Sequence, residues 1–140
     1  MRSQIETLTE INLDDLVNAL GWQRRRPLRA IVRALGAGPA RGFARRVLDY
    51  DNDVGRSGLP SASIRLLRQL AGGLRVFGRE HIPPVGPLLV LSNHPGMTDT
   101  LALFAAIDRS DLKIIARHVP FLRVLANISR QLYYLDDDAS

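Results

Sequence analysis

In the second half of the chain, segments with the apolar pattern of a strand alternate with segments that have the apolar spacing of a helix. Four short segments have the length and apolar character of strands, at residues 74–77, 88–91, 112–116 and 131–135. Residues 98–107 and 121–128 lie between them and carry apolar side chains at helical spacing. Strands that alternate with helices predict an α/β fold, with a mainly parallel sheet and flanking helices.

The first part of the chain predicts helices. Apolar side chains recur at helical spacing over residues 12–20, 27–35, 40–50 and 60–71. Two glycines and a proline predict a break at residues 36–39, and the polar composition of residues 49–58 predicts a loop. The chain is therefore expected to divide into a helical N-terminal segment, residues 1–58, and an α/β part, residues 59–140.

Charge distinguishes the N-terminal segment. The formal net charge of the chain is +5, and Lys113 is its only lysine. No acid lies between Trp22 and Leu48, while this stretch holds Arg24, Arg25, Arg26, Arg29, Arg33, Arg41, Arg45 and Arg46. A basic amphipathic segment with a tryptophan suits an anionic membrane surface. A solvated helix face is the alternative, and nucleic acid is not an expected partner because no recognition motif accompanies the arginines.

The apolar runs are too short for a membrane span, which needs roughly 20 residues. No secretory signal is expected, because the N-terminal residues include Glu6 and Glu10 and lack the apolar core of a signal peptide. The chain has no cysteine, which excludes disulfides and thiol nucleophiles. These features together predict a cytoplasmic protein that is peripheral to the membrane.

A histidine stands where the predicted strand 88–91 ends and the helix 98–107 begins. Pro95 and Gly96 break regular secondary structure, so the backbone can fold back and bring Asp99 near His94. A carboxylate bonded to one imidazole nitrogen leaves the other as a proton acceptor. The pair is thus a candidate general base with its orienting group, and a loop histidine beside a helix-capping aspartate is the alternative.

The sequence Asn-His-Pro-Gly-Met-Thr-Asp at residues 93–99 resembles the NHxxxxD signature of the glycerolipid acyltransferases, which include the 1-acylglycerol-3-phosphate acyltransferases. The sequence Gly-Arg-Glu-His-Ile-Pro at residues 78–83, followed by Gly-Pro-Leu-Leu-Val at 86–90, is similar to the segment that leads into that signature. The resemblance covers about residues 74–135. The Glu-Gly-Thr-Arg segment with which the family binds a phosphate is absent from the sequence.

The resemblance implies transfer of a fatty acyl group from acyl-CoA or acyl-carrier protein to a hydroxyl of glycerol phosphate or lysophosphatidic acid, in phospholipid synthesis. His94 would be the general base and Asp99 its partner, with no metal or other cofactor. Contacts to substrate are expected from Asn93, Gly96, Thr98 and Arg117. Residues 59–140 would then be the front part of an acyltransferase-like domain. The alternative is a catalytically inactive, truncated relative that acts as a membrane-binding or interaction module.

Overall fold

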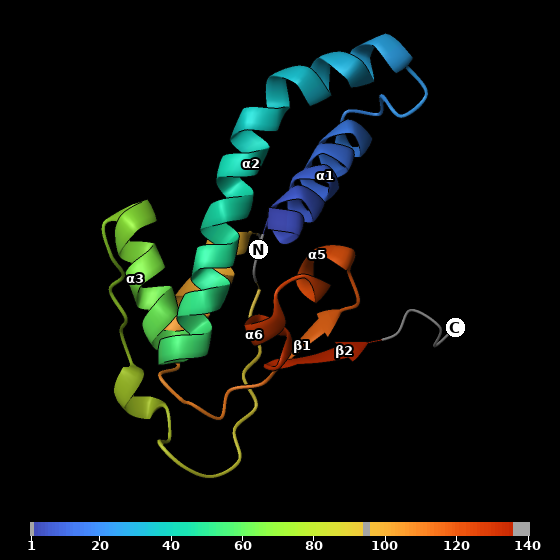
Figure 1. The fold of residues 1–140 in the computed structure, drawn as a ribbon. Helices are drawn as coiled ribbons and strands as arrows, with labels where there is room; N and C mark the ends of the chain where they lie inside the picture. Colours follow the sequence, from blue (N-terminus) through green and yellow to red (C-terminus); the bar gives the residue numbers. More distant parts are fainter. Residues whose placement is uncertain (1, 94–95, 136–140) are drawn as a thin grey trace.

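The computed structural model describes residues 2–93 and 96–135 (Figure 1). In chain order, its elements are α1 (Arg2–Ala19), α2 (Arg26–Ser57), α3 (Leu59–Ala71), the 3-10 turn η1 (Arg79–His81), α4 (Met97–Ala106), β1 (Ile114–Arg117), α5 (Pro120–Arg123), α6 (Ala126–Ser129) and β2 (Leu132–Leu135). This part of the chain is mostly helical, with one small parallel sheet, which is compatible with the predicted α/β class.

Helices α1 and α2 form a long hairpin that extends away from the rest of the chain (Figure 1). Leu13, Val17 and Val32 are buried. A Cβ built on Gly36 would lie 2.9 Å from Cδ2 of Leu13, so this glycine allows the two helices to approach closely. The expectation that helical structure begins near residue 12 is wrong, because Leu8 is fully buried and the turns that carry it are also helical.

Helix α2 runs unbroken through two places where the sequence predicts interruptions. The predicted break at residues 36–39 is wrong: Pro39 lies inside the helix, which bends along its length (Figure 1). Proline removes one helical N–H but can be accommodated as a bend. The predicted loop at residues 49–58 is also wrong. The carboxylates of Asp51 and Asp53 have partners in the fold, and Val54 is buried on the same helical face as Asp51.

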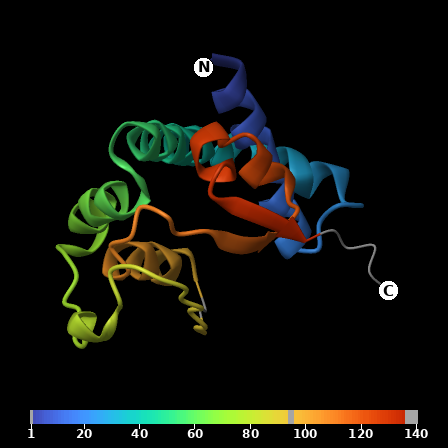
Figure 2. The ribbon, with the colours of Figure 1, turned by 90° about the horizontal axis from the view of Figure 1, so that it is seen from below.

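The main core joins residues from both ends of the chain. Its buried members are Leu8, Ala44, Leu48, Val54, Leu59, Ala62, Leu125 and Ile128. A second cluster, formed by Leu67, Leu101 and Ala105, packs α3 against α4, and these two helices lie side by side (Figure 2). The second half of α2 contributes to the core that also holds α6, so it organises the C-terminal elements.

A buried carboxylate fixes the position of α6. Asp51 is 5 % exposed. Its Oδ1 accepts hydrogen bonds from the backbone N–H of Ile128 at 2.8 Å and of Asn127 at 3.1 Å, and its Oδ2 accepts one from Nδ2 of Asn127 at 3.1 Å. Gly55 lies against Asn127, where a Cβ would come within 2.6 Å of the amide oxygen. Asp51 therefore satisfies N–H groups at the first turn of α6 that have no partner within the helix.

The sheet consists of β1 and β2, paired in parallel with Ile114 opposite Leu132 and Arg117 opposite Leu135. The parallel pairing of the two C-terminal predicted strands is confirmed. The helix predicted over residues 121–128 is instead two short helices, α5 and α6, which form the crossover between the strands.

The other two predicted strands, residues 74–77 and 88–91, are not strands in the structure. A strand requires backbone hydrogen bonds to a neighbour, and the part of the chain that the structure describes pairs only β1 with β2. Their apolar side chains are accordingly open to solvent, with Phe77 at 89 % and Leu91 at 85 % exposure.

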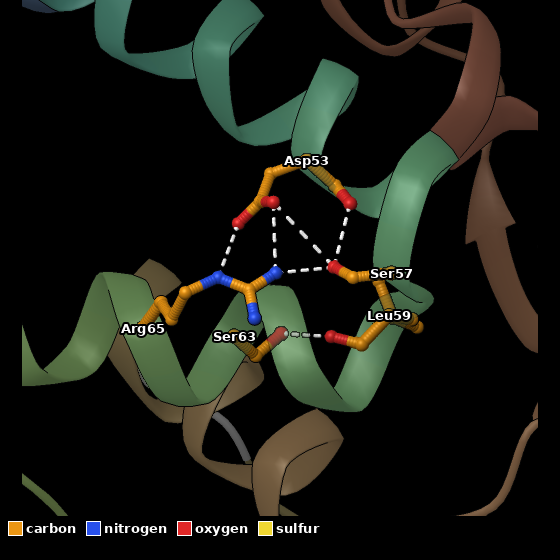
Figure 3. A network of polar contacts seen from close by, with 5 residues as sticks. All are labelled: Asp53, Ser57, Leu59, Ser63 and Arg65. Atoms are coloured by element: carbon orange, nitrogen blue, oxygen red, sulfur yellow. Dashed lines mark hydrogen bonds and ion pairs between the residues drawn. The ribbon is translucent and has the colours of Figure 1, made fainter.

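A polar network joins α2 to α3 (Figure 3). Arg65 donates from Nε and Nη2 to the two carboxylate oxygens of Asp53, each at 2.8 Å, and also to Ser57 Oγ. Ser63 donates to the carbonyl of Leu59 and shares a 2.7 Å hydrogen bond with Tyr50. Burial raises the pKa of Tyr50 to about 12, so this phenol is neutral. The network fixes the tight turn between the two helices.

Replacing Asp51 with alanine should destabilise the protein markedly. The substitution leaves buried N–H groups at the start of α6 without an acceptor, and we expect the free energy of unfolding to fall by about 3 kcal/mol. Chemical denaturation measures this loss. Asp49→Ala, at an exposed position of the same helix, is the control and should change stability by less than about 0.5 kcal/mol. Equal losses in the two variants would contradict the capping role of Asp51.

The Asp53–Arg65 pair predicts an acid-sensitive contribution to stability. The hydrogen bonds from Arg65 hold the pKa of Asp53 below its ordinary value. A lowered pKa in the folded state stabilises the protein above the unfolded-state pKa of about 3.9, and this contribution is lost as the pH falls through the folded-state pKa. The stability difference between wild type and Asp53→Asn, measured by denaturation from pH 6 to pH 3, should therefore shrink toward the acid end. A difference independent of pH would show that the ion pair does not contribute.

Candidate functional site

A large apolar cavity lies between the second half of α2, helix α4 and the sheet. Its volume is about 1010 Å³. The side chains that line it from these elements and from residues 88–92 include Phe43, Val47, Tyr50, Leu88, Leu89, Val90, Leu91, Met97, Leu101, Phe104, Ile114 and Ile115. Phe43 also stacks on Phe121 of α5, with ring centroids 6.3 Å apart, and both rings line the cavity. The cavity is large enough for an extended apolar group of a ligand.

The charged residues that line the cavity are all basic. They are Arg46, Arg109, Lys113 and Arg117. Arg109 is held by Asp111 at 2.6 Å and by the carbonyls of Pro83 and Gly86, and this pairing raises the pKa of its guanidinium. Lys113 donates to the carbonyl of Arg130 at 2.8 Å. An apolar lining that includes basic side chains favours an amphiphile that has an anionic group.

We refer to residues 93–96, which directly precede α4 in the sequence, as the histidine turn. His94, the candidate base, and Pro95 lie outside the described residues. Asp99 is exposed in the first turn of α4, next to Gly96, which precedes the helix. A Cβ built on Gly96 would lie 3.5 Å from Oδ2 of Asp99, so this carboxylate reaches back over the start of the helix. The orienting role of Asp99 toward His94 stays a prediction, because His94 lies outside the described residues.

The predicted substrate-binding residues occupy two places. Asn93, Gly96 and Thr98 are exposed around the turn and do not line the cavity, whereas their neighbours Ser92 and Met97 do. Arg117 ends β1 and lines the same cavity. The structure therefore brings Arg117 and the two sides of the histidine turn to one cavity, although they lie about 20 residues apart in the sequence.

The start of α4 adds electrostatic character to this region. Its N-cap residue, Gly96, provides no side-chain cap, and Asp99 is the acidic residue of its first turn. The first N–H groups of a helix have no intrahelical partner and favour a negative charge or a developing oxyanion. The four N-terminal residues of α4, Met97 to Thr100, are therefore suited to charge stabilisation beside the cavity.

Sequence reasoning missed the contribution of α2 to the cavity. Arg46 was assigned to the basic surface, yet it lines the cavity together with Phe43, Val47 and Tyr50. These positions follow the spacing of one helical face, i, i+3, i+4 and i+7, so the helix predicted over residues 40–50 already contained the signal. By contrast, His118 contacts the ring of Tyr134 edge-on at 5.1 Å and has a packing role.

Two features were sought in the described residues and not found. Within residues 2–93 and 96–135, no group of three or more histidine, aspartate or glutamate side chains is placed to hold a metal ion. In the same residues, no helix is both long and apolar enough to cross a bilayer.

Comparisons of the chain with protein-family models, with curated proteins and with solved structures found no match.

Proposed function

We propose that this chain is an acyltransferase of the glycerolipid type, peripheral to the cytoplasmic side of a membrane. It would move a fatty acyl group from acyl-CoA or acyl-carrier protein to a hydroxyl of glycerol phosphate or lysophosphatidic acid. The observation that carries the proposal is that Ser92, directly before the NHxxxxD-like sequence, and Met97, within it, both line a large apolar cavity. In this view residues 59–140 are the front part of an acyltransferase-like domain.

The cavity supports substrates of this chemistry. Burial of an aliphatic chain against its apolar walls is favourable by about 0.8 kcal/mol for each methylene. The anionic phosphate of the donor or acceptor would bind basic side chains of the lining, which include Arg46 and Arg117. A guanidinium binds a phosphate through two parallel hydrogen bonds and keeps its charge at any physiological pH.

The proposed reaction uses side chains and backbone N–H groups of the chain itself. His94 takes the proton of the acceptor hydroxyl, and the oxygen attacks the thioester carbonyl carbon. The tetrahedral intermediate then collapses with cleavage of the C–S bond, and the imidazolium returns its proton to the leaving thiolate. Asp99 holds the imidazole and stabilises its charged form. The start of α4 stabilises the oxyanion.

Substitution of the base tests the assignment. His94→Ala should lower kcat about 10²- to 10⁴-fold, because proton removal from the hydroxyl is lost. Release of the CoA thiol from acyl-CoA, in the presence of lysophosphatidic acid or glycerol phosphate, measures turnover. The chain contributes no background thiol, since it has no cysteine. Asp99→Asn should lower kcat less.

The matched control is His81→Ala, because the His81 side chain is 83 % exposed in the η1 turn and lies outside the cavity lining. This variant should retain wild-type turnover. A His94→Ala variant as active as wild type would overturn the assignment.

Ligand binding should depend on chain length. A series of saturated fatty acids that displace a fluorescent long-chain analogue should bind more tightly with each added methylene, by up to about fourfold, as the aliphatic chain fills the cavity. Thr100→Trp, which adds volume at the cavity wall, should weaken the long members more than the short ones. Affinity that does not change with chain length would contradict an acyl-binding role for the cavity.

The second candidate is a catalytically inactive relative that acts as a membrane-binding or interaction module. The exposed arginines beside Trp22 favour it, because a basic segment with a tryptophan suits an anionic membrane surface. A wild-type chain that binds lipid vesicles but releases no CoA from any acyl donor and acceptor tested would support this candidate over the first.

A further inference from the structure

The α1–α2 hairpin exposes aliphatic side chains on one flank. Leu16 lies on α1, and Leu20 directly follows the helix and donates its N–H to the carbonyl of Leu16 at 3.1 Å. Ile31 and Leu35 lie one turn apart on α2. In chain order, the four residues are 45 %, 43 %, 51 % and 76 % exposed. We refer to these four residues as the aliphatic flank. Single exposed apolar side chains are common on protein surfaces, whereas several of them gathered on two adjacent helices indicate an interaction surface.

A narrow groove continues this flank between the helices. It has a volume of about 270 Å³ and is lined by Asn12, Leu13, Leu16, Gly36, Pro39, Ala40 and Phe43. None of these side chains is charged. Because Leu16 belongs both to the groove and to the aliphatic flank, the two form one continuous apolar surface on the hairpin.

The acidic residues that pair across the hairpin lie on the opposite flank. Arg33 binds Glu10 at 2.6 Å and Asp14 at 2.7 Å, and both carboxylates raise the pKa of Arg33. With 3.6 residues per turn, Glu10 and Asp14 lie on one side of the α1–α2 contact, and Leu16 and Leu20 lie on the other. The ion pairs therefore leave the aliphatic flank free of these negative charges.

Positive charge gathers at the tip of the hairpin. Arg24 and Arg25 are exposed in the turn between the helices, Arg26 is exposed at the first position of α2, and Trp22 in the same turn is half-buried. Arginines next to an indole and an aliphatic surface match the charge and the apolar depth of an anionic bilayer interface. A nucleic acid would complement the arginines but would offer nothing to the leucines and the isoleucine.

We propose that the aliphatic flank and the arginine tip bind the surface of an anionic bilayer, with the hairpin lying in the interface. Phe43 gives this orientation a consequence, because it lines both the groove and the large cavity. The bound hairpin would thus place the edge of the cavity near the lipid, and an amphiphile could pass along the groove and over Phe43. The passage rests on the proposed acyl-transfer function, whereas the docking itself does not.

Vesicle sedimentation of the full chain tests the docking. With vesicles of phosphatidylglycerol and phosphatidylcholine, Leu35→Asp should weaken binding at least about tenfold, because it places a charge where an apolar side chain enters the interface. The control is Ala34→Asp, which adds the same charge to the adjacent exposed position, on a different side of α2. A Leu35→Asp variant that binds as wild type, or the same loss in both variants, would overturn the proposed face. Thermal unfolding by circular dichroism confirms that both variants are folded.

The electrostatic part has its own variant. Replacing Arg24, Arg25 and Arg26 with glutamine should weaken binding about fivefold for each arginine that faces the surface, and added salt should reduce the difference. Binding that does not depend on anionic lipid, or that is abolished by competing RNA while Leu35→Asp has no effect, would overturn the proposal. His94→Ala should bind vesicles as wild type does, so a failure of acyl transfer is distinguishable from a failure of docking.

Discussion

The carboxylate of Asp51 joins the long helix α2 to the C-terminal elements of the chain. It is buried and accepts hydrogen bonds from the backbone N–H groups of Asn127 and Ile128. Since α6 lies in the crossover between β1 and β2, the sheet takes its position from this one contact together with the apolar core around it. The cavity depends on the same contact, because its walls are formed by α2 on one side and by β1 on another.

Such a contact explains why the local polarity of residues 49–58 misled the sequence reasoning. Three aspartates and an asparagine within ten residues ordinarily indicate a solvent-exposed turn. Here Asp51 caps a distant helix and Asp53 binds Arg65, so tertiary partners use the polar groups that would otherwise favour a loop. Similarly, the helical packing of Leu13 against Gly36 keeps α2 continuous through a glycine- and proline-containing stretch. Neither partner is visible from a local window of sequence.

The elements that were predicted well carry their signals locally. Helices α3 and α4 each begin directly after a glycine, α3 has a proline in its first turn, and both show regular apolar spacing. Strands β1 and β2 are short, mainly apolar runs that pair with each other. Residues 74–77 and 88–91 have equally apolar sequences but no pairing partner in the described chain, so composition alone could not decide between strand and open segment. For the site, the sequence placed Asp99 at the start of a helix, but it could not indicate that Arg46 and Arg117 line one cavity.

The unpaired segment at residues 88–91 has a consequence for the site. Its four apolar residues line the cavity instead of lying within a sheet, so the wall beside the histidine turn consists of side chains that face solvent when nothing covers them. Exposing this much aliphatic surface is costly in water, and the cost falls when the surface meets a hydrocarbon chain or a bilayer. The same reasoning applies to the aliphatic flank of the hairpin, which meets the cavity at Phe43. The proposed docking to an anionic bilayer would cover both surfaces, because they meet at one residue.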